Sequence, residues 1–494
     1  MFQEYRIITV RLFILCAILT LYSLSAYAQS YPENLSCEQK YKRAWEACNQ
    51  KYNGKCKYLG ASFKPSCTID SPGTEKPHIA GDASDSIELL LNTPTAFNKP
   101  EKTCRSEICT SLLSAIENAN HTIDFAIYGM RGQPEILEAL IKANKRGVKV
   151  RGLVDKDIKN KSYYKDTDKL IDALSNVRTD YDSDLATLAM LKNKSSKYKN
   201  KCKRPDGYKG PLQCFEGKGY ASKGKINFKG DIMHNKFFII DNNTVWTGSA
   251  NISDTGTGGY NANISTLIKS KFIAHYYTIE FNQMYELGRH HRQKEILKKA
   301  NLTTVINNKD VSLYFSPQGY AMYKGVIPLI KSAQKTIDIA VFFLTHKNVS
   351  LELVKAKERG VQVRVILDAT AATNGYSKHN YLRKHGIQVK VESWGGKMHM
   401  KSAIIDSSHL IIGSMNWTSA GESKNDENTI VIKNSGNLGT KYSVFFSKLW
   451  ESIPNKWLDE EPNAESIDSI NSCTDGIDND FDHQVDDNDI SCRK

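Results

Sequence analysis

Apolar residues in the middle of the chain occur in short, nearly continuous runs. Such runs cover residues 122–128, 147–155, 336–342 and 360–368. Amphipathic stretches with helical periodicity cover residues 111–120, 136–146, 326–334 and 351–359. Short apolar runs that alternate with helices predict an α/β sheet whose faces are both covered by helices.

The order of these predicted elements is the same in two parts of the chain. A helix, a strand, a second helix and a second strand fill residues 111–155, and the same elements recur in residues 326–368. Self-similarity of this kind indicates an internal duplication. We therefore predict two α/β lobes, with mixed sheets covered by helices, in residues 83–300 and 301–458.

A short polar motif is also repeated, at a constant distance. Residues 234–251 and 399–416 both fit the pattern H-x-K-x(4)-D-x(6)-G-S-x-N. The copies are 165 residues apart, and the same offset relates Asn263 to Asn428 beyond the motif. Packing does not explain two identically spaced copies, so we interpret the motif as functional.

The two halves differ in length before the motif. Asp155 and His234 are 79 residues apart, whereas Asp368 and His399 are 31 residues apart. We place the 48 additional residues in a basic insert at about 157–229, which is rich in Lys, Tyr and Gly. A surface loop and a lid that contacts substrate are both compatible with this composition.

Residues 1–28 have the layout of a secretory signal. Arg6 and Arg11 flank an apolar run from Leu12 to Leu24, which is followed by Ala26-Tyr27-Ala28. We predict cleavage after Ala28 and a secreted or periplasmic protein. A retained membrane anchor is the alternative, but the apolar run is short for one.

The cysteines agree with export. Removal of Cys16 with the signal leaves ten, in close groups: Cys37, Cys48, Cys56 and Cys67; Cys104 and Cys109; Cys202 and Cys214; and Cys473 and Cys492. Such grouping predicts local disulfides, although their pairing cannot be deduced. The first four define a small cysteine-rich segment at 29–82. Their spacing does not fit common zinc knuckles.

The formal charge of +13 is unevenly distributed. Residues 459–494 contain twelve acidic and two basic residues, and residues 1–28 carry a net +1, so residues 29–458 carry +22. A strongly basic body attracts polyanions. We therefore expect a phospholipid or anionic membrane surface as the partner, with nucleic acid as the alternative.

The acidic tail at 459–494 contains a possible calcium loop. Acids occupy loop positions 1, 3, 5, 9 and 12, which is the ligand spacing of an EF-hand: Asp478, Asp480, Asp482, Asp486 and Asp489. His483 stands where that loop prefers Gly. We predict a structural calcium ion, and the alternative is a solvated acidic tail closed by a Cys473–Cys492 bridge.

The repeated motif has the chemistry needed for phosphodiesters. Each copy presents an imidazole and an ammonium on one face of a strand, followed by a hydroxyl and a carboxamide. Two copies face to face would supply lysines that hold phosphate oxygens, one imidazole as nucleophile and the other as general acid. We therefore expect no catalytic metal, because the lysines supply the positive charge.

The paired motif resembles that of the phospholipase D superfamily, in its form with two motifs in one chain. The resemblance covers residues 85–458 and implies a ping-pong reaction through a phosphohistidine at a pseudo-twofold interface. It implies His234 as nucleophile and His399 as general acid/base. It further implies phosphate binding by Lys236, Lys401, Asn251 and Asn416, support from Ser249 and Ser414, and structural roles for Asp241 and Asp406.

One position departs from the expected symmetry. The family often uses a carboxylate to orient a catalytic imidazole, and Glu427 occupies this position in the second half. The constant offset places Ala262 there in the first half. We therefore predict that the His399 half keeps its own carboxylate. Either His234 takes one from elsewhere, with Asp254 and Glu280 as candidates, or the roles of the two histidines differ from those that the family implies.

Three activities fit this chemistry. An exported phospholipase D that releases phosphatidate and a head group is favoured by the predicted export and the basic body. A secreted metal-independent endonuclease and a cardiolipin-synthase-like phosphatidyltransferase are the alternatives. A non-catalytic protein that binds phosphodiesters is disfavoured, because both His and both Lys are present. We expect a monomer.

Overall fold

The computed structural model describes residues 82, 84–197, 207, 209, 212–213, 222–223, 228–296 and 302–493. The chain divides into compact units at 1–76 and 77–494, and all described residues belong to the second unit. The predicted signal and, apart from Asp82, the cysteine-rich segment lie outside the described residues. Within the described part, no helix has the length and apolar character required to span a bilayer.

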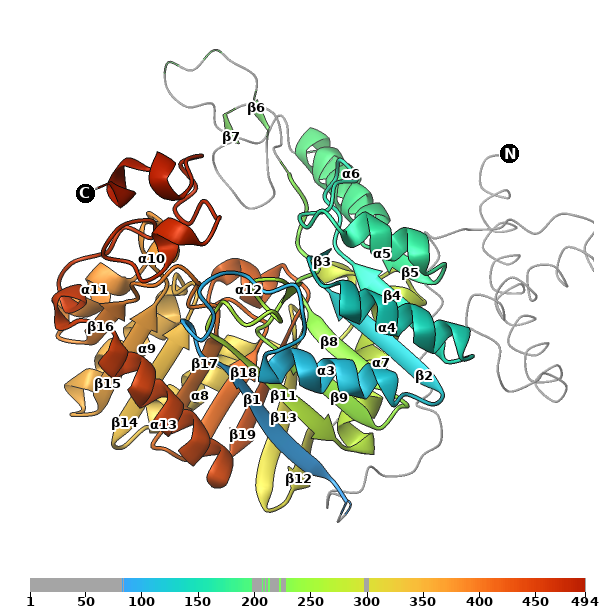
Figure 1. The fold of residues 1–494 in the computed structure, drawn as a ribbon, viewed down its shortest axis with the longest axis horizontal. Helices are drawn as coiled ribbons and strands as arrows, with labels where there is room; N and C mark the ends of the chain where they lie inside the picture. Colours follow the sequence, from blue (N-terminus) through green and yellow to red (C-terminus); the bar gives the residue numbers. More distant parts are fainter. Residues whose placement is uncertain are drawn as a thin grey trace, which may run out of the picture. The chain divides into compact units, whose positions relative to one another are not determined.

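The first lobe is built on a seven-stranded sheet with the order β1-β11-β9-β8-β2-β4-β5 (Figure 1). In chain order its strands are β1 Ser86–Asn92, β2 Thr122–Ile127, β4 Lys149–Val154, β5 Val177–Thr179, β8 Lys236–Ile240, β9 Thr244–Gly248 and β11 Asn263–Lys269. Strands β2, β4 and β5 are parallel, and the remaining pairs are antiparallel. The sheet is therefore mixed, as predicted.

The second lobe repeats this sheet and adds one edge strand, in the order β12-β13-β19-β18-β17-β14-β15-β16. Its strands are β12 Thr303–Ile306, β13 Lys309–Ser316, β14 Thr336–Val341, β15 Gln362–Leu367, β16 Gln388–Val391, β17 Lys401–Ile405, β18 His409–Gly413 and β19 Glu427–Lys433. The seven strands β13-β19-β18-β17-β14-β15-β16 match β1-β11-β9-β8-β2-β4-β5 in spatial order and direction. The duplicated α/β fold is confirmed.

Helices cover both faces of the two sheets. The outer faces carry α3 Glu107–Glu117 and α4 Pro134–Lys145 in the first lobe, and α8 Ile327–Ser332 and α9 Lys347–Glu358 in the second. Helices α7 Lys271–Tyr285 and α13 Asn437–Ser452 lie in the core shared by both lobes. That shared core unites apolar residues of both sheets, so the lobes are packed face to face.

Helix α4 illustrates how the sequence determines these elements. Pro134 lies in its first turn, where no backbone N–H is needed, and Gly147 follows its end with φ +92°. Its buried residues recur at helical spacing: Ile136, Ala139, Leu140 and Ala143. This spacing places one apolar stripe against the sheet.

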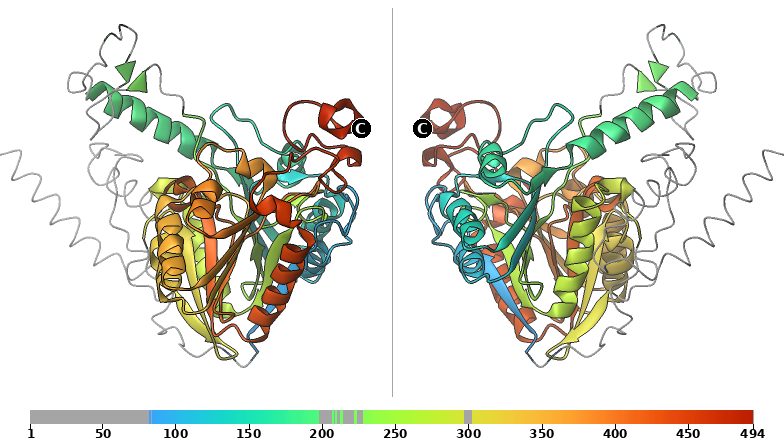
Figure 2. Two further views of the ribbon diagram at one scale, coloured as in Figure 1. Left: turned by 90° about the vertical axis from the view of Figure 1, so that its left-hand side faces the viewer. Right: turned by 90° about the vertical axis from the view of Figure 1, so that its right-hand side faces the viewer.

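The insert is shorter than predicted. Helix α5 Thr167–Ala173 and strand β5 have counterparts in α11 His379–Lys384 and β16, so they belong to the repeated fold. A parallel strand requires such a crossover connection. The additional residues follow Asp180 and begin with α6 Tyr181–Lys197, which extends away from the sheets (Figure 2). The predicted start at residue 157 was therefore wrong.

The remaining described elements are short. They are β3 Met130–Arg131, β6 Leu212–Gln213, β7 Ser222–Lys223, β10 Ile252–Ser253, α10 Ala369–Ala372, α12 Ser419–Ser423, the 3-10 turns η2 His291–Gln293 and η4 Asn455–Leu458, and the π-helical turn η3 Met322–Val326. Strands β3 and β10 pair in parallel beside the first motif. Cys104 and Cys109 form a disulfide, whereas the predicted groups of Cys37 to Cys67 and of Cys202 and Cys214 lie outside the described residues.

The acidic tail is folded against the second lobe. It contains the 3-10 turns η5 Ser472–Thr474, η6 Asp486–Asn488 and η7 Ile490–Cys492, and a Cys473–Cys492 disulfide. The backbone of Ile470 accepts a hydrogen bond from Gly395 at 2.7 Å and donates one to Ser393 at 2.9 Å. The tail thus supports the segment that leads into the second motif.

Candidate active site

The two motif histidines lie where the lobes meet. Each precedes a central strand, β8 for His234 and β17 for His399, and each is only 8% exposed. The backbone N–H of His234 donates to the Asp426 carbonyl at 2.9 Å, and that of His399 donates to the Ala262 carbonyl at 3.0 Å. Each motif is therefore tied to the opposite lobe.

Glu427 contacts the histidine of the opposite lobe. His234 Nδ1 lies 2.9 Å from both Glu427 carboxylate oxygens. Our prediction that Glu427 serves the His399 half was therefore wrong. The sheets face each other, so the first residue of β19 reaches across the interface. The candidates Asp254 and Glu280 were also wrong, because they pair with Arg131 and Lys294.

Asn263 is the first-lobe counterpart of Glu427. Its Oδ1 lies 3.3 Å from His399 Nδ1, which is also 3.1 Å from the Ser249 carbonyl. Ser249 Oγ donates to Asn263 at 2.8 Å, just as Ser414 Oγ donates to Glu427 at 2.6 Å. The two histidines thus have equivalent surroundings, with a carboxamide in place of a carboxylate.

The constant offset therefore fails just beyond the motif. Asn263 and Glu427 are 164 residues apart, because the first half has one additional residue in the loop before β11. The pairing of Asn263 with Asn428, and of Ala262 with Glu427, was wrong. Asn428 instead joins the lobes, since its Oδ1 accepts from Thr247 and Tyr277, both at 3.0 Å.

The motif lysines are buried and have no acidic partner within ion-pair distance among the described residues. Lys236 Nζ donates to the His234 carbonyl at 2.6 Å, and Lys401 Nζ to the His399 carbonyl at 2.7 Å. Lys236 also lies over the ring of Tyr128 and Lys401 over that of Phe342. Two buried ammonium groups side by side favour an anionic ligand.

The electrostatics of the site also favour an anionic ligand. Burial, followed by the two lysine charges, holds the pKa of both His234 and His399 well below the usual value. Burial lowers the pKa of Lys236 to about 7 and that of Lys401 well below its normal range, whereas it raises the pKa of Glu427 to about 8. A bound phosphate would stabilise the charged lysines.

The polar residues at the end of each motif divide into two kinds. The Ser249 and Ser414 hydroxyls each donate to a side chain and accept from a backbone N–H, so they have no proton left for phosphate. By contrast, Asn251 and Asn416 end in carboxamides, whose Nδ2 carries two N–H groups that can donate to phosphate oxygens. The Oδ1 of each has no partner in the described structure, but as an acceptor it does not bind phosphate. Tyr164 accepts from Asn251 Nδ2 at 2.9 Å. No sequence signal distinguished Tyr164 from the other tyrosines of the insert predicted at 157–229.

The motif aspartates lie away from the histidines. Asp241 accepts the backbone N–H groups of Asn120, His121 and Thr122, and Asp406 makes the same contacts with residues 334–336. Partial burial alone would raise the pKa of each, but the three N–H groups lower it. These aspartates fix the turn at the far end of the motif strand.

Only part of the predicted calcium loop comes together in the folded tail. Asp480, Asp482 and Asp489 have ligand oxygens within 4.8 Å of one another, and Asp478 lies with Asp480 and Glu465 in a second such group. Asp486 was predicted wrongly, because its carboxylate accepts the backbone N–H groups of residues 475 and 476. Glu465 lies outside the predicted loop spacing, and its carboxylate accepts the backbone N–H groups of Asn479 and Asp486.

Comparison with known proteins identifies the family. The family model described as "Cardiolipin synthase, PLD-like domain" matches residues 112–285 and 326–450. A mitochondrial cardiolipin hydrolase of Chlamydomonas reinhardtii is 36% identical over 120 residues, which are 24% of this chain and 53% of that protein. A phospholipase D of Rickettsia bellii is 29% identical over 139 residues, 28% of this chain and 68% of the relative.

Solved structures give similar matches. A phospholipase D family member, Nuc from Salmonella typhimurium, is 31% identical, and the match covers 30% of this chain and 97% of that one with a TM-score of 0.29. The phosphatidylserine synthase of Haemophilus influenzae is 16% identical over 76% of this chain and 88% of its own, with a TM-score of 0.49. Because the family model matches more than half of the chain, this protein belongs to the phospholipase D superfamily.

Proposed function

We propose that this protein is an exported phospholipase D that hydrolyses a phospholipid phosphodiester to phosphatidate and a free head group. The observation that carries the proposal is the pair of buried imidazoles, one held by Glu427, beside two buried lysines that have no acidic partner within ion-pair distance among the described residues. Relatives named phospholipase D and cardiolipin hydrolase support a lipid substrate.

In the first step, His234 acts as the nucleophile. Its Nδ1 faces Glu427, so Nε2 is the nitrogen that attacks phosphorus. The positive charge that then develops on the imidazole is stabilised by the neighbouring carboxylate. Burial and the lysine charges lower the pKa of His399, and the negative charge of a bound phosphodiester would raise it again. Protonated His399 then gives a proton to the leaving head-group oxygen as the P–O bond breaks.

In the second step, water displaces His234 from phosphorus. His399, now neutral, takes a proton from a water molecule, the water oxygen bonds to phosphorus, and the P–N bond to His234 breaks. Lys236 and Lys401 neutralise the non-bridging oxygens in both steps, and the amides of Asn251 and Asn416 assist them. The lysines thus supply the charge stabilisation that the transition state requires.

Two further features support an exported, membrane-directed enzyme. Residues 1–28 have a signal-like composition, and the basic body would be attracted to anionic lipid surfaces. The same charge suits a nuclease, so nucleic acid is the main alternative substrate. Transfer to an alcohol acceptor, as in a phosphatidyltransferase, would use the same covalent intermediate.

One incubation series separates these activities. Purified protein in excess chelator is given phosphatidylcholine or phosphatidylglycerol vesicles, with and without added glycerol, and separately plasmid DNA. We expect release of choline or glycerol, formation of phosphatidate and intact plasmid. Nicked plasmid with unchanged lipid would refute the proposal, and a predominance of transfer product would identify a transferase.

We also propose that the tail binds calcium as a structural ion. Asp489 is 1% exposed, and its Oδ2 has no partner in the described structure although it lies with Asp480 and Asp482. Calcium prefers such oxygen ligands. Calcium should raise the Tm of the chelated protein in wild type but not in Asp489→Asn, and activity in chelator should persist. No Tm response in wild type would exclude the site.

A further inference from the structure

A buried polar group that the proposed mechanism does not use lies behind the first motif. It consists of Asp180, which follows β5, Asp184 in the first turn of α6, and His291 in η2. All three residues are at most 1% exposed, and one ligand atom from each lies within 4.8 Å of the others. Two parts of the chain that are far apart in the sequence thus converge on one point.

The distances within the group are compatible with a metal centre. His291 Nε2 lies 3.2 Å from Asp180 Oδ2 and 3.5 Å from Asp184 Oδ1. Neither ring nitrogen of His291 makes a well-directed hydrogen bond within the described residues, and Asp180 Oδ2 and Asp184 Oδ2 also have no such partner. Ligands bound at about 2.0–2.1 Å in a tetrahedral zinc site lie roughly 3.3 Å from one another.

The charge of the group also calls for a cation. Two buried carboxylates face one imidazole, so even a protonated His291 would leave a net negative charge. The neighbouring basic residues are engaged elsewhere, since Arg292 pairs with Asp231, and Lys294 pairs with Asp426 and Glu280. A divalent ion would balance the two carboxylates.

The other ring nitrogen of His291 contacts a third acidic residue. His291 Nδ1, the ring nitrogen remote from the two aspartates, lies 3.0 Å from Asp426 Oδ2. Imidazoles that bind a metal usually face a carboxylate or carbonyl with their other nitrogen. The carbonyl of Asp426 in turn accepts the backbone N–H of His234, so the group is connected to the candidate nucleophile.

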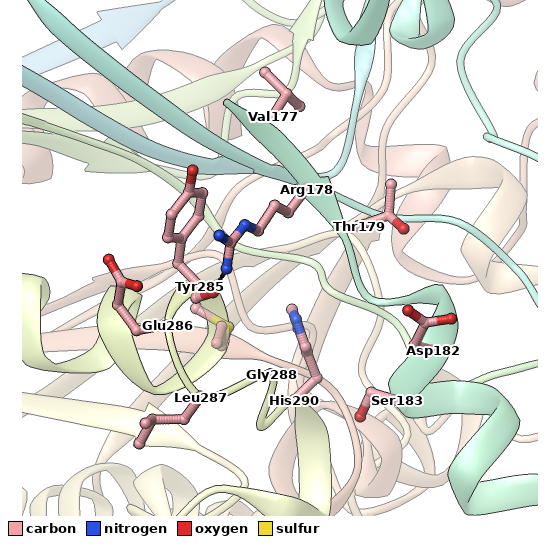
Figure 3. Close-up of a pocket in the computed structure, with 11 residues that line it drawn as sticks. Val177, Arg178, Thr179, Asp182, Ser183, Tyr285, Glu286, Leu287, Gly288 and His290 are labelled. Atoms are coloured by element: carbon pink, nitrogen blue, oxygen red, sulfur yellow. Dashed lines mark hydrogen bonds between the residues drawn. The ribbon is translucent and has the colours of Figure 1, made fainter. Parts of the chain in front are cut away.

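A cavity lies beside the group, although none of the three proposed ligands lines it. Its volume is about 520 Å³. Several of the residues that line it are neighbours in sequence of the three proposed ligands, namely Thr179, Asp182, Ser183 and His290 (Figure 3). The cavity is lined by neither motif histidine, so it is separate from the candidate active site.

We propose that Asp180, Asp184 and His291 bind one divalent transition-metal ion, with zinc as the best match to one nitrogen and two oxygen ligands. The ion would fasten α6 to the base of the first motif. The second lobe has Glu392 in place of Asp180, where its carboxylate likewise accepts a backbone N–H, but it has no counterpart of α6. The site therefore belongs to the lobe with the insertion.

Metal analysis of the purified full-length protein tests this directly. After removal of loosely bound ions, we expect about one zinc per chain, and its extraction by a strong chelator should lower Tm. Added zinc should restore Tm, whereas calcium should not. A wild-type protein that retains no transition metal, and whose Tm does not respond to equimolar zinc after chelation, would refute the proposal and indicate a protonated His291 network instead.

Variants locate the ion. His291→Gln and Asp184→Asn should each reduce zinc occupancy at least tenfold, while Asp182→Asn, an exposed acid on the same helix, should leave it unchanged. Cooperative unfolding of Asp184→Asn would establish that it is folded. Full zinc occupancy in both ligand variants would overturn the assignment. Since metal content is the readout, the result is independent of the substrate.

Discussion

Glu427 in the second lobe and His234 in the first lie in contact across the interface, with both carboxylate oxygens 2.9 Å from Nδ1. The counterpart of this pair joins His399 to the neutral Asn263. The internal duplication is therefore nearly symmetric in geometry and asymmetric in charge. A carboxylate stabilises a positive imidazole, so this asymmetry agrees with the proposed role of His234 as the nucleophile.

Glu427→Gln should keep the position of His234 and remove the charge behind it. We expect kcat to fall by about 10²- to 10⁴-fold, because the imidazole that becomes positive in the transition state loses its carboxylate. Steady-state kinetics with vesicles measure this. Glu422→Gln is the matched control, because Glu422 is a buried glutamate that lies away from the histidines and accepts the backbone N–H groups of Met322 and Tyr323. A fall of less than about fivefold in E427Q would contradict the role of the dyad.

His399→Ala should separate the two chemical steps. With bis(p-nitrophenyl) phosphate, the leaving group needs little protonation, so His234 can still be phosphorylated, but no base then activates water. We expect one equivalent of p-nitrophenolate per active chain and a stable mass increase of the protein. His234→Ala should give neither. A burst in H234A, or sustained turnover in H399A, would show that the histidine roles are assigned wrongly.

The fold was predictable because it depends on local patterns. The strands predicted at 336–342 and 360–368 were placed to within a residue or two, since apolar runs and helical periodicity are properties of neighbouring residues. The partner of Glu427 was not predictable, because it depends on how two sheets face each other. The counterpart of Glu427 was missed for a different reason, a one-residue change in a loop, which leaves both flanking strands intact.

Some roles of motif residues were predictable from local sequence, and others depend on the tertiary fold. The structural position of Asp241 follows from its place at the end of a short strand, and the structure has it there. The internal bonds of Ser249 and Ser414 could not be read from the pattern, because a serine after a strand serves equally well as a ligand or as a support. Tyr164 reaches the site only through the tertiary fold.

Asn263→Asp should make the surroundings of His399 resemble those of His234. The change loses little hydrogen bonding, because Asn263 Nδ2 has no partner in the described structure while its Oδ1 keeps the Ser249 hydroxyl. A carboxylate beside His399 raises the pKa of that imidazole, so the general acid stays protonated to higher pH. We expect the alkaline limb of the kcat/KM profile to move upward by roughly one pH unit. An unchanged limb would mean that His399 does not determine it.

Lys236→Met should lower activity and raise stability together. Loss of the ammonium should reduce kcat/KM by about 10²- to 10³-fold, since phosphate loses a direct charge contact. Burial lowers the folded-state pKa of Lys236 to about 7 from 10.5, so the unfolded chain binds the proton more tightly and the lysine destabilises the fold. That destabilisation is full below pH 7 and disappears as pH rises toward the unfolded value.

The Lys236→Met variant should therefore be more stable than wild type by about 1–3 kcal/mol near pH 6, with a difference that shrinks toward pH 10. Denaturant unfolding at several pH values measures this. Lys169→Met, at an exposed lysine of the first lobe, is the control and should change neither quantity. If Lys236→Met were less stable than wild type at pH 6, the lysine would have an anionic partner in the folded protein, and the phosphate-binding role inferred from its burial would be wrong.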